Sequence, residues 1–286
     1  MEDLDDGEGP EMVIVNDERR YPEGVPSWID VETDDPAAAA RFYGALFGWE
    51  VHEAMPPGAP GSYLIATLDG HDVAAIAPVT GGAAARWNTY VACDDADRTA
   101  AAVQAAGGRV LSGPEDAGPG GRLAVCADPG GALFRLWQAR RRLGAQLVNE
   151  PGTWNFSVLL TAHPGEILPF YREVFRWEVD PGLGAGMVRL PGYGDHLAAT
   201  IDPDIRERQA FAPPGFADVV AGVERADVPA HWEVRFTVDD RDAAVALAVE
   251  NGATVVRTDD GEWTKEALLR DPQGAEFTVS QFSPSA

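Results

Sequence analysis

Alternating apolar and polar residues predict a β-strand near the start of the chain, followed at once by a helix. Ile29 and Val31 are apolar between polar or bulky neighbours, which is the two-residue period of a half-buried strand. The segment Asp34-Asp35-Pro36 then places a capping residue directly before a proline at the first helical position. The helix predicted over 37–47 ends at Gly48, a residue typical of a helix C-terminus.

The same order of elements returns further along the chain. Strand-like segments at 63–68 and 73–77 flank Asp69-Gly70, which is typical of a hairpin turn. Another strand is predicted over 87–93, followed by a second helix over 98–106. Three more strands are predicted over 109–111, 123–127 and 132–137. The pattern therefore predicts two consecutive β-α-β-β-β units.

The chain then repeats itself. Phe42-Tyr43 recurs as Phe170-Tyr171, and Asp128-Pro129 recurs as Asp271-Pro272. A repeat of this length is a whole module rather than a solenoid unit. We predict an α+β protein in which two tandem modules each form a curled sheet around a cleft. The predicted divisions are an acidic, largely flexible N-terminal tail (1–25), module 1 (26–139), a linker (140–152) and module 2 (153–283).

Composition narrows the class of protein. The 286 residues are 45% hydrophobic and carry a formal net charge of −24, so the surface repels phosphate backbones and nucleic-acid binding is not expected. Apolar runs are interrupted too often for a membrane helix, and the acidic N-terminus does not resemble a signal peptide. We expect a cytoplasmic monomer or homodimer with no membrane partner. Cys93 and Cys126 have apolar counterparts in module 2, so we expect reduced core residues.

Three segments connect the chain with a known superfamily. Residues 34–44 (Asp-Asp-Pro-Ala-Ala-Ala-Ala-Arg-Phe-Tyr-Gly), Gly107-Gly108-Arg109-Val110 and Asp128-Pro129-Gly130-Gly131 resemble the vicinal-oxygen-chelate superfamily. It includes glyoxalase I, bleomycin-resistance proteins and extradiol dioxygenases. The resemblance covers residues 26–283 and is closest to a tandem, glyoxalase-like actinobacterial branch. One cleft hosts many chemistries in such a superfamily, so the resemblance implies the fold more narrowly than the function.

The resemblance also implies where a metal would be held. Metal-dependent members place His, Gln or Glu ligands on the first, fourth, fifth and eighth strands of a module, with positions left open for substrate. In module 1 these positions hold no ordinary ligand, since they fall on Trp28, Ala74 or Ala75, Asn88 and Arg135. In module 2 they fall on Trp154 or Phe156, Ala198 or Ala199, Glu233 and Thr278.

One carboxylate alone cannot hold a catalytic metal, so we expect no metal and no cofactor. A site formed by His196, His231 and Glu233 is an alternative. It is disfavoured because Asp195-His196 is interpreted as a turn and His231 lies at the entrance of its strand. The simpler interpretation is two surface histidines.

Strand alternation indicates which side chains face the clefts. In module 1 it predicts an aromatic-walled cleft in which Asp30 and Tyr90 are candidates for proton transfer. Glu233 is the corresponding candidate in module 2, although a salt bridge between Glu233 and Arg235 is the favoured interpretation of that pair. For Asp30 and Arg135, mutual neutralisation and ligand binding are equally open. The residues predicted to bind a ligand are Trp28, Asn88, Arg135, Trp137, Trp154, Arg235 and Thr278.

Four functions remain open from the sequence. Two of them are preferred jointly, and in both a metal-independent cleft binds a planar aromatic or polyketide-like small molecule. The first sequesters that molecule, and the second carries out acid–base chemistry on it, such as isomerisation, cyclisation or hydration. A metal-dependent glyoxalase-like lyase or dioxygenase is the alternative. A purely structural or regulatory role is another. The triple arginine Arg140-Arg141-Arg142 is interpreted as a solvated linker, with anion binding as the less favoured interpretation.

Overall fold

The computed structural model describes residues 19–79, 81–184 and 186–284. Module 1 forms one eight-stranded sheet. Its elements are β1 (Pro26–Thr33), α1 (Pro36–Phe47), β2 (Glu50–Glu53), β3 (Leu64–Leu68), β4 (His71–Pro78), β5 (Arg86–Ala92), α2 (Ala96–Ala105), β6 (Arg109–Ala117), β7 (Gly121–Ala127) and β8 (Leu133–Ala139). The strand order is β2-β3-β4-β1-β5-β8-β7-β6, so the two β-α-β-β-β units join at β1 and β5.

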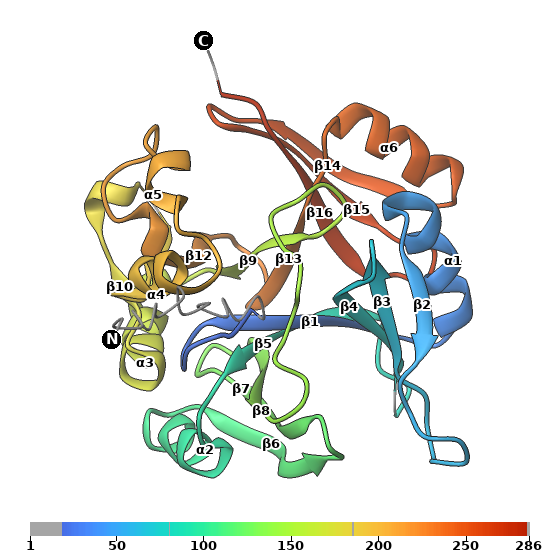
Figure 1. The fold of residues 1–286 in the computed structure, drawn as a ribbon, viewed down its shortest axis with the longest axis horizontal. Helices are drawn as coiled ribbons and strands as arrows, with labels where there is room; N and C mark the ends of the chain where they lie inside the picture. Colours follow the sequence, from blue (N-terminus) through green and yellow to red (C-terminus); the bar gives the residue numbers. More distant parts are fainter. Residues whose placement is uncertain (1–18, 80, 185, 285–286) are drawn as a thin grey trace, which may run out of the picture.

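Module 2 forms a second eight-stranded sheet with the equivalent order, β10-β11-β12-β9-β13-β16-β15-β14. Its elements are β9 (Trp154–Thr161), α3 (Pro164–Phe175), β10 (Glu178–Val179), η1 (Pro181–Leu183), β11 (Met187–Arg189), α4 (Tyr193–Thr200), α5 (Ile205–Arg208), η2 (Phe216–Asp218), β12 (Val219–Arg225), β13 (His231–Thr237), α6 (Arg241–Glu250), β14 (Thr254–Asp260), β15 (Thr264–Arg270) and β16 (Glu276–Phe282). The predicted α+β fold of two tandem modules is confirmed (Figure 1).

Local sequence signals account for the helix ends. The Asp35 carboxylate accepts a hydrogen bond of 2.9 Å from the Ala38 amide, and Pro36 occupies the first turn of α1, where its missing N–H costs nothing. Gly48 ends the helix with φ of 75°, a conformation that side chains with a Cβ rarely adopt. Asp240 caps α6 in the same way, through the amides of Asp242 and Ala243.

Module 2 departs from the predicted repeat between β11 and β12. Asp195 and His196, interpreted above as a turn, lie in α4, and so do Ala198 and Ala199, which were expected on the fourth strand. The strand that pairs with β9 is instead β12. Those expectations were wrong because the chain inserts α4, α5 and η2 here, which module 1 lacks. None of the described helices is long and apolar enough to cross a membrane.

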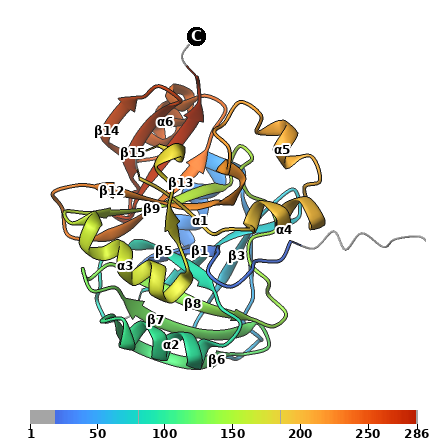
Figure 2. The same cartoon turned by 90° about the vertical axis from the view of Figure 1, so that its left-hand side faces the viewer.

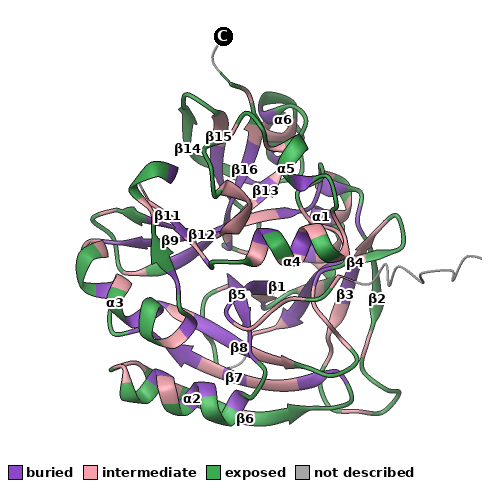
Figure 3. Ribbon diagram, turned by 60° about the vertical axis from the view of Figure 1, so that its left-hand side comes forward, coloured by how far each residue is buried: buried purple, intermediate pink, exposed green. Residues whose placement is uncertain are grey.

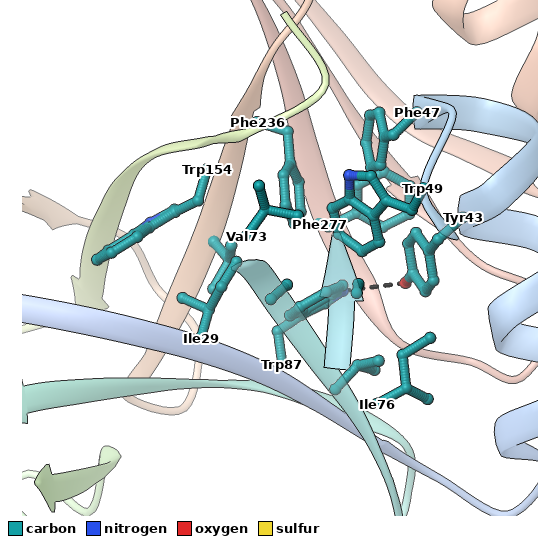
Figure 4. Close-up of a cluster of buried hydrophobic side chains, with 14 of the residues drawn as sticks. Ile29, Tyr43, Phe47, Trp49, Val73, Ile76, Trp87, Trp154, Phe236 and Phe277 are labelled. Atoms are coloured by element: carbon teal, nitrogen blue, oxygen red, sulfur yellow. Dashed lines mark hydrogen bonds between the residues drawn. The ribbon is translucent and has the colours of Figure 1, made fainter. Parts of the chain in front are cut away.

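The two modules share their hydrophobic cores crosswise. One cluster joins the first half of module 1 to the second half of module 2, with Trp49 and Trp87 packed against Phe236 (Figure 4). The other cluster joins the second half of module 1 to the first half of module 2, and it contains both cysteines, which are buried and free. Accordingly, α1 lies against α6 in Figure 1 and α3 lies against α2 in Figure 2. The central strands are buried, whereas the outer strands β2, β6 and β14 are exposed (Figure 3).

Two reciprocal hydrogen bonds connect the modules inside these cores. The Tyr43 hydroxyl donates to Asp271 over 2.8 Å and accepts from the Trp87 indole over 3.0 Å. The symmetry-related Tyr171 donates to Asp128 over 2.9 Å. The repeated Phe-Tyr and Asp-Pro motifs of the sequence are therefore the two sides of one contact, made twice.

We predict that Tyr43→Phe and Tyr171→Phe each lower the free energy of unfolding by about 1–3 kcal/mol, because each leaves a buried carboxylate oxygen without its donor. Urea unfolding monitored by tryptophan fluorescence measures this change. Tyr193→Phe is the matched control. It removes a partly buried hydroxyl on α4 that interacts with Arg19 rather than with a carboxylate, and it should cost less stability than either of the other two substitutions. Equal effects of all three substitutions would contradict the prediction.

Candidate functional site

The concave face of module 1 holds a polar network centred on Asp30, in the middle of β1. The β-sheet register places Asp30 opposite Asn88 on β5, and it places Tyr90 opposite Arg135 on β8. Asn88 Nδ2 donates to Asp30 Oδ1 over 2.8 Å, and the Tyr90 hydroxyl donates to Asp30 Oδ2. Tyr63, just before β3, adds a further donor to the same oxygen at 3.2 Å. The carboxylate of Asp30, which is completely buried, is therefore surrounded by donors.

Arg135 supplies the positive charge of this network. Its Nη1 lies 3.1 Å from Asp30 Oδ2 and 2.6 Å from the Tyr90 hydroxyl, and its Nη2 forms an ion pair with Glu32. Arg86 bonds to the other oxygen of Glu32 over 3.3 Å. The predicted alternative of an Asp30–Arg135 ion pair is thus present.

Burial and neighbouring charges shift the pKa of three groups in this network. Burial acts to lower the pKa of Arg135, but the carboxylates of Asp30 and Glu32 outweigh it and raise that pKa. Burial, together with the Asp30 charge, raises the pKa of Tyr90, so its hydroxyl remains a donor at neutral pH. Burial acts to raise the pKa of Glu32, but the Arg135 guanidinium outweighs it, and the pKa lies below its ordinary value of 4.5.

Aromatic side chains flank the network. The Trp28 indole donates to the Tyr63 hydroxyl over 2.9 Å, and the Arg135 guanidinium lies 5.2 Å from the centre of the Tyr90 ring. Trp137 meets the Tyr90 ring edge-on at 6.3 Å. The cleft-facing residues predicted for module 1 therefore lie together. Glu32, Arg86, Tyr63 and Trp137 form its more accessible margin.

The concave face of module 2 carries an ion pair whose two members lie on one strand. Glu233 and Arg235 both lie on β13, where Arg235 Nε donates to Glu233 Oε1 over 3.2 Å. The Thr278 hydroxyl donates to the same oxygen over 3.0 Å, and Arg235 also contacts Glu224 and Glu266. Where module 1 has Asp30 on its first strand, module 2 has Val158, which lies opposite Glu233 in the register.

Glu233 keeps one oxygen without a hydrogen bond. Its side chain is 3% exposed, and Oε2 has no hydrogen-bond partner among the residues described. Arg257 Nη2 lies 3.6 Å from this oxygen, on a half-exposed side chain. Of the three residues predicted for proton transfer, Glu233 is therefore the one whose carboxylate has an oxygen available as an acceptor.

Trp154 does not lie on the cleft side of module 2, and its expected placement was wrong. A register shift at Asn155 pairs Trp154 with Phe236, whose ring packs against Trp49 and Trp87. Trp154 therefore belongs to the core shared between the modules (Figure 4). A single extra residue in a strand reverses the faces of the residues beyond it, and alternation alone does not reveal it.

The residues of both faces do not fit a divalent metal. In module 1 the Arg135 guanidinium lies among the carboxylates, the Asp30 oxygens already accept hydrogen bonds, and Ala75 stands opposite Asp30 in the register. A fixed cation and saturated acceptors leave no donor set for a second cation. No group of three or more His, Cys, Asp or Glu side chains suited to a metal occurs in the described part of the chain.

His196 and His231 are not brought together with Glu233 in a metal site. His196 lies on α4, where its Nε2 is 3.0 Å from the Arg20 carbonyl oxygen. His231 is exposed, and its Nδ1 is 2.8 Å from the Pro229 carbonyl oxygen. The two cysteines are equally inert, since burial raises the pKa of each thiol to about 12.

Paired β-α-β-β-β units that curl around a polar face define a vicinal-oxygen-chelate protein. The glyoxalase-like domain model matches the chain twice, over residues 28–137 and 155–280. The chain therefore belongs to the glyoxalase-like domain family.

Two curated relatives match almost the whole chain. CFP32 of Mycobacterium tuberculosis is 38% identical over 270 residues, covering 92% of this chain and 97% of its own length. The anthracycline biosynthesis protein DnrV of Streptomyces peucetius is 35% identical over 276 residues, covering 91% of this chain and 94% of its own.

Solved structures share the fold at low sequence identity. The Mn(II)-bound glyoxalase from Novosphingobium aromaticivorans superimposes with a TM-score of 0.58 at 15% identity, covering 91% of this chain and 82% of its own. The 2,3-dioxygenase LapB from Pseudomonas sp. KL28 gives a TM-score of 0.57 at 14% identity, with coverages of 93% and 98%. At these identities the likeness describes the fold.

We predict that Arg135→Met lowers the free energy of unfolding by about 3–5 kcal/mol, because it leaves the buried Asp30 carboxylate without its cation. Urea unfolding of Arg135→Met, Asp30→Asn and the double variant measures the coupling between the two residues. The double variant should lose less stability than the two single losses combined. Arg86→Met, which removes a more exposed partner of Glu32, should cost less than about 1 kcal/mol. Strict additivity would contradict a coupled network.

The lowered pKa of Glu32 predicts a pH dependence. A carboxyl group with a depressed pKa in the folded state contributes stability above its unfolded value of 4.5, and that contribution is lost as the pH falls through the folded value. The stability difference between the wild type and Glu32→Gln should therefore be largest at neutral pH and shrink below pH 4.5. Urea unfolding at several pH values between 3 and 7 tests this on the scale of about 1 kcal/mol. A constant difference would contradict it.

Proposed function

We propose that this protein binds a planar, oxygen-bearing aromatic small molecule of the polyketide kind at the concave face of module 1, without a metal ion. The observation that carries the proposal is the position of the Arg135 guanidinium between Asp30 and Glu32, with the Tyr90 hydroxyl at 2.6 Å. A fixed cation and oriented hydroxyl and amide groups interact with the oxygens of an organic ligand directly. The chain then acts by sequestering its ligand or presenting it for further reaction.

The accessible margin of the face can contact both the oxygen atoms and the aromatic ring system of such a ligand. Arg86 has a side chain that is 40% exposed, so its guanidinium can contact a phenolate or carbonyl oxygen. Trp137 and Tyr63 are partly buried and offer flat apolar surfaces for an aromatic ring system. The inner residues Asp30 and Tyr90 then orient the groups above them rather than contacting bulk solvent.

Similarity to a biosynthetic protein supports this ligand class. DnrV, named for anthracycline biosynthesis, aligns with nearly all of this chain at 35% identity. A protein that handles a fused-ring product or intermediate needs flat walls and a few directional polar groups, and the module 1 face has both.

A second candidate function is acid–base catalysis in module 2. It is favoured by the buried Glu233 oxygen that has no hydrogen-bond partner in the described part of the chain. Such an oxygen can take a proton from a carbon next to a carbonyl group, while Arg235 and Thr278 hold the carboxylate in place. Asp30 and Tyr90 stay the corresponding candidates in module 1, but each is already engaged with the other.

Binding of 1,8-dihydroxyanthraquinone, followed by quenching of tryptophan fluorescence, tests the first proposal. We expect Arg86→Gln and Trp137→Leu each to weaken binding by about tenfold, since each removes one contact worth about 1–2 kcal/mol. Trp263→Leu is the matched control, because Trp263 is 48% exposed and packs against Phe211 in module 2. Its affinity should equal that of the wild type. Unchanged affinity in both module 1 variants would overturn the proposal.

Deuterium incorporation into 1-tetralone next to its carbonyl group, followed by NMR in D₂O, tests the second candidate. The wild type should accelerate the exchange, and Glu233→Gln should abolish that acceleration. Arg86→Gln should leave it unchanged, because Arg86 belongs to the other module. Equal exchange with the wild type and Glu233→Gln rules out Glu233 as the base.

A further inference from the structure

A cavity of about 320 Å³ opens where the inter-module linker crosses the edge of module 1. It is lined on one side by Arg141 and Arg142 of the linker and on another by Arg19, ahead of β1. Asp72, at the start of β4, is its acidic residue. The cavity therefore brings together three guanidinium groups from two distant parts of the chain.

Backbone hydrogen bonds attach the linker firmly to module 1. The Arg142 amide donates to the Gly120 carbonyl over 3.1 Å, and the Ala145 amide donates to the Ser27 carbonyl over 2.8 Å. Between them, Gly144 has φ of 126°, and a Cβ there would lie 2.4 Å from the Ser27 carbonyl oxygen. The arginines of the cavity thus project from an ordered backbone rather than from a loose connection.

The positive charge of the cavity is only partly neutralised. Arg142 forms an ion pair of 2.9 Å with Asp72. Arg141 and Arg19 form no ion pair with any acid of the described chain, although the formal net charge is −24. Arg19 instead lies 6.0 Å from the centre of the Tyr21 ring and beside Tyr193, whose pKa is raised by burial and lowered only in part by the Arg19 guanidinium. Two guanidinium groups are thereby positioned beside a cavity without a carboxylate partner.

We propose that this cavity is a binding site for a small organic anion, recognised by its carboxylate or phosphate group. Guanidinium groups bind such oxygens through paired, charge-assisted hydrogen bonds, and three of them around one space favour an anion over a neutral molecule. The volume lies at the lower end of the range of small-molecule pockets. An acidic surface elsewhere makes this cavity a local region of opposite charge.

This site is separate from the polar network of module 1. Trp137 stands between them, with its ring against Tyr90 on one side and its Nε1 donating to the Arg142 carbonyl oxygen over 2.8 Å on the other. None of the network residues Asp30, Asn88 or Arg135 lines the cavity. The proposal therefore goes beyond the function proposed above and stands or falls independently of it.

Isothermal titration calorimetry of the full chain with 2-naphthoate tests the proposal, and inorganic phosphate in a parallel titration distinguishes the two anion types. We expect saturable binding of at least one anion at a single site. Arg141→Gln and Arg19→Gln should each weaken it about tenfold, which is the effect of losing one charge-assisted hydrogen bond. Binding should also weaken as the salt concentration rises.

Arg140→Gln is the matched control. It removes the same charge one residue away, but Arg140 pairs with Asp116 over 2.8 Å and does not line the cavity. This control should bind the anion as the wild type does, and the neutral amide 2-naphthamide should not bind. Three results would each overturn the proposal: no binding of either anion, unchanged affinity in both cavity variants, or an equal loss in Arg140→Gln.

Discussion

The reciprocal hydrogen bonds between tyrosine and aspartate decide how the rest of this molecule is arranged. Each joins a helix of one module to the turn before the last strand of the other, as Tyr43 does with Asp271. The Trp87 indole donates to the same hydroxyl, so an aromatic core and a polar contact are built at one point. Because a buried hydroxyl and carboxylate have no water to bond with, each depends on the other. The helical side of each sheet therefore packs against the other module, and the concave faces remain for binding or catalysis.

Those concave faces carry the same kind of charge pair in different ways. In module 1 the acid lies on the first strand, as Asp30, and the base on the last, as Arg135. In module 2 both charges lie on the fifth strand of the module, as Glu233 and Arg235. A buried ion pair gives little stability in net terms, because desolvation opposes its Coulombic attraction. Charge in these positions is therefore compatible with the ligand-binding role proposed for the module 1 face.

Much of this could be predicted from the sequence, because alternation and repetition are local signals. Alternation alone placed Asp30, Asn88 and Tyr90 on one face, where the register brings them together. Alternation could not reveal the register shift that turns Trp154 into the core, because one added residue in a strand has no recognisable sequence signal. The insertion between β11 and β12 was missed because the repeat was assumed to continue through it. The contact between modules had a signal, the joint recurrence of two motifs, but only tertiary structure shows that they meet.

The crosswise sharing of cores has a consequence for the history of this architecture. Each core is completed by the opposite module, so neither module encloses its own apolar residues. Two identical single-module chains related by a twofold axis would form the same pair of contacts, as an isologous homodimer does. Fusion of the two genes would then free each copy to diverge. That divergence is visible where one module has Asp30 and the other has Val158.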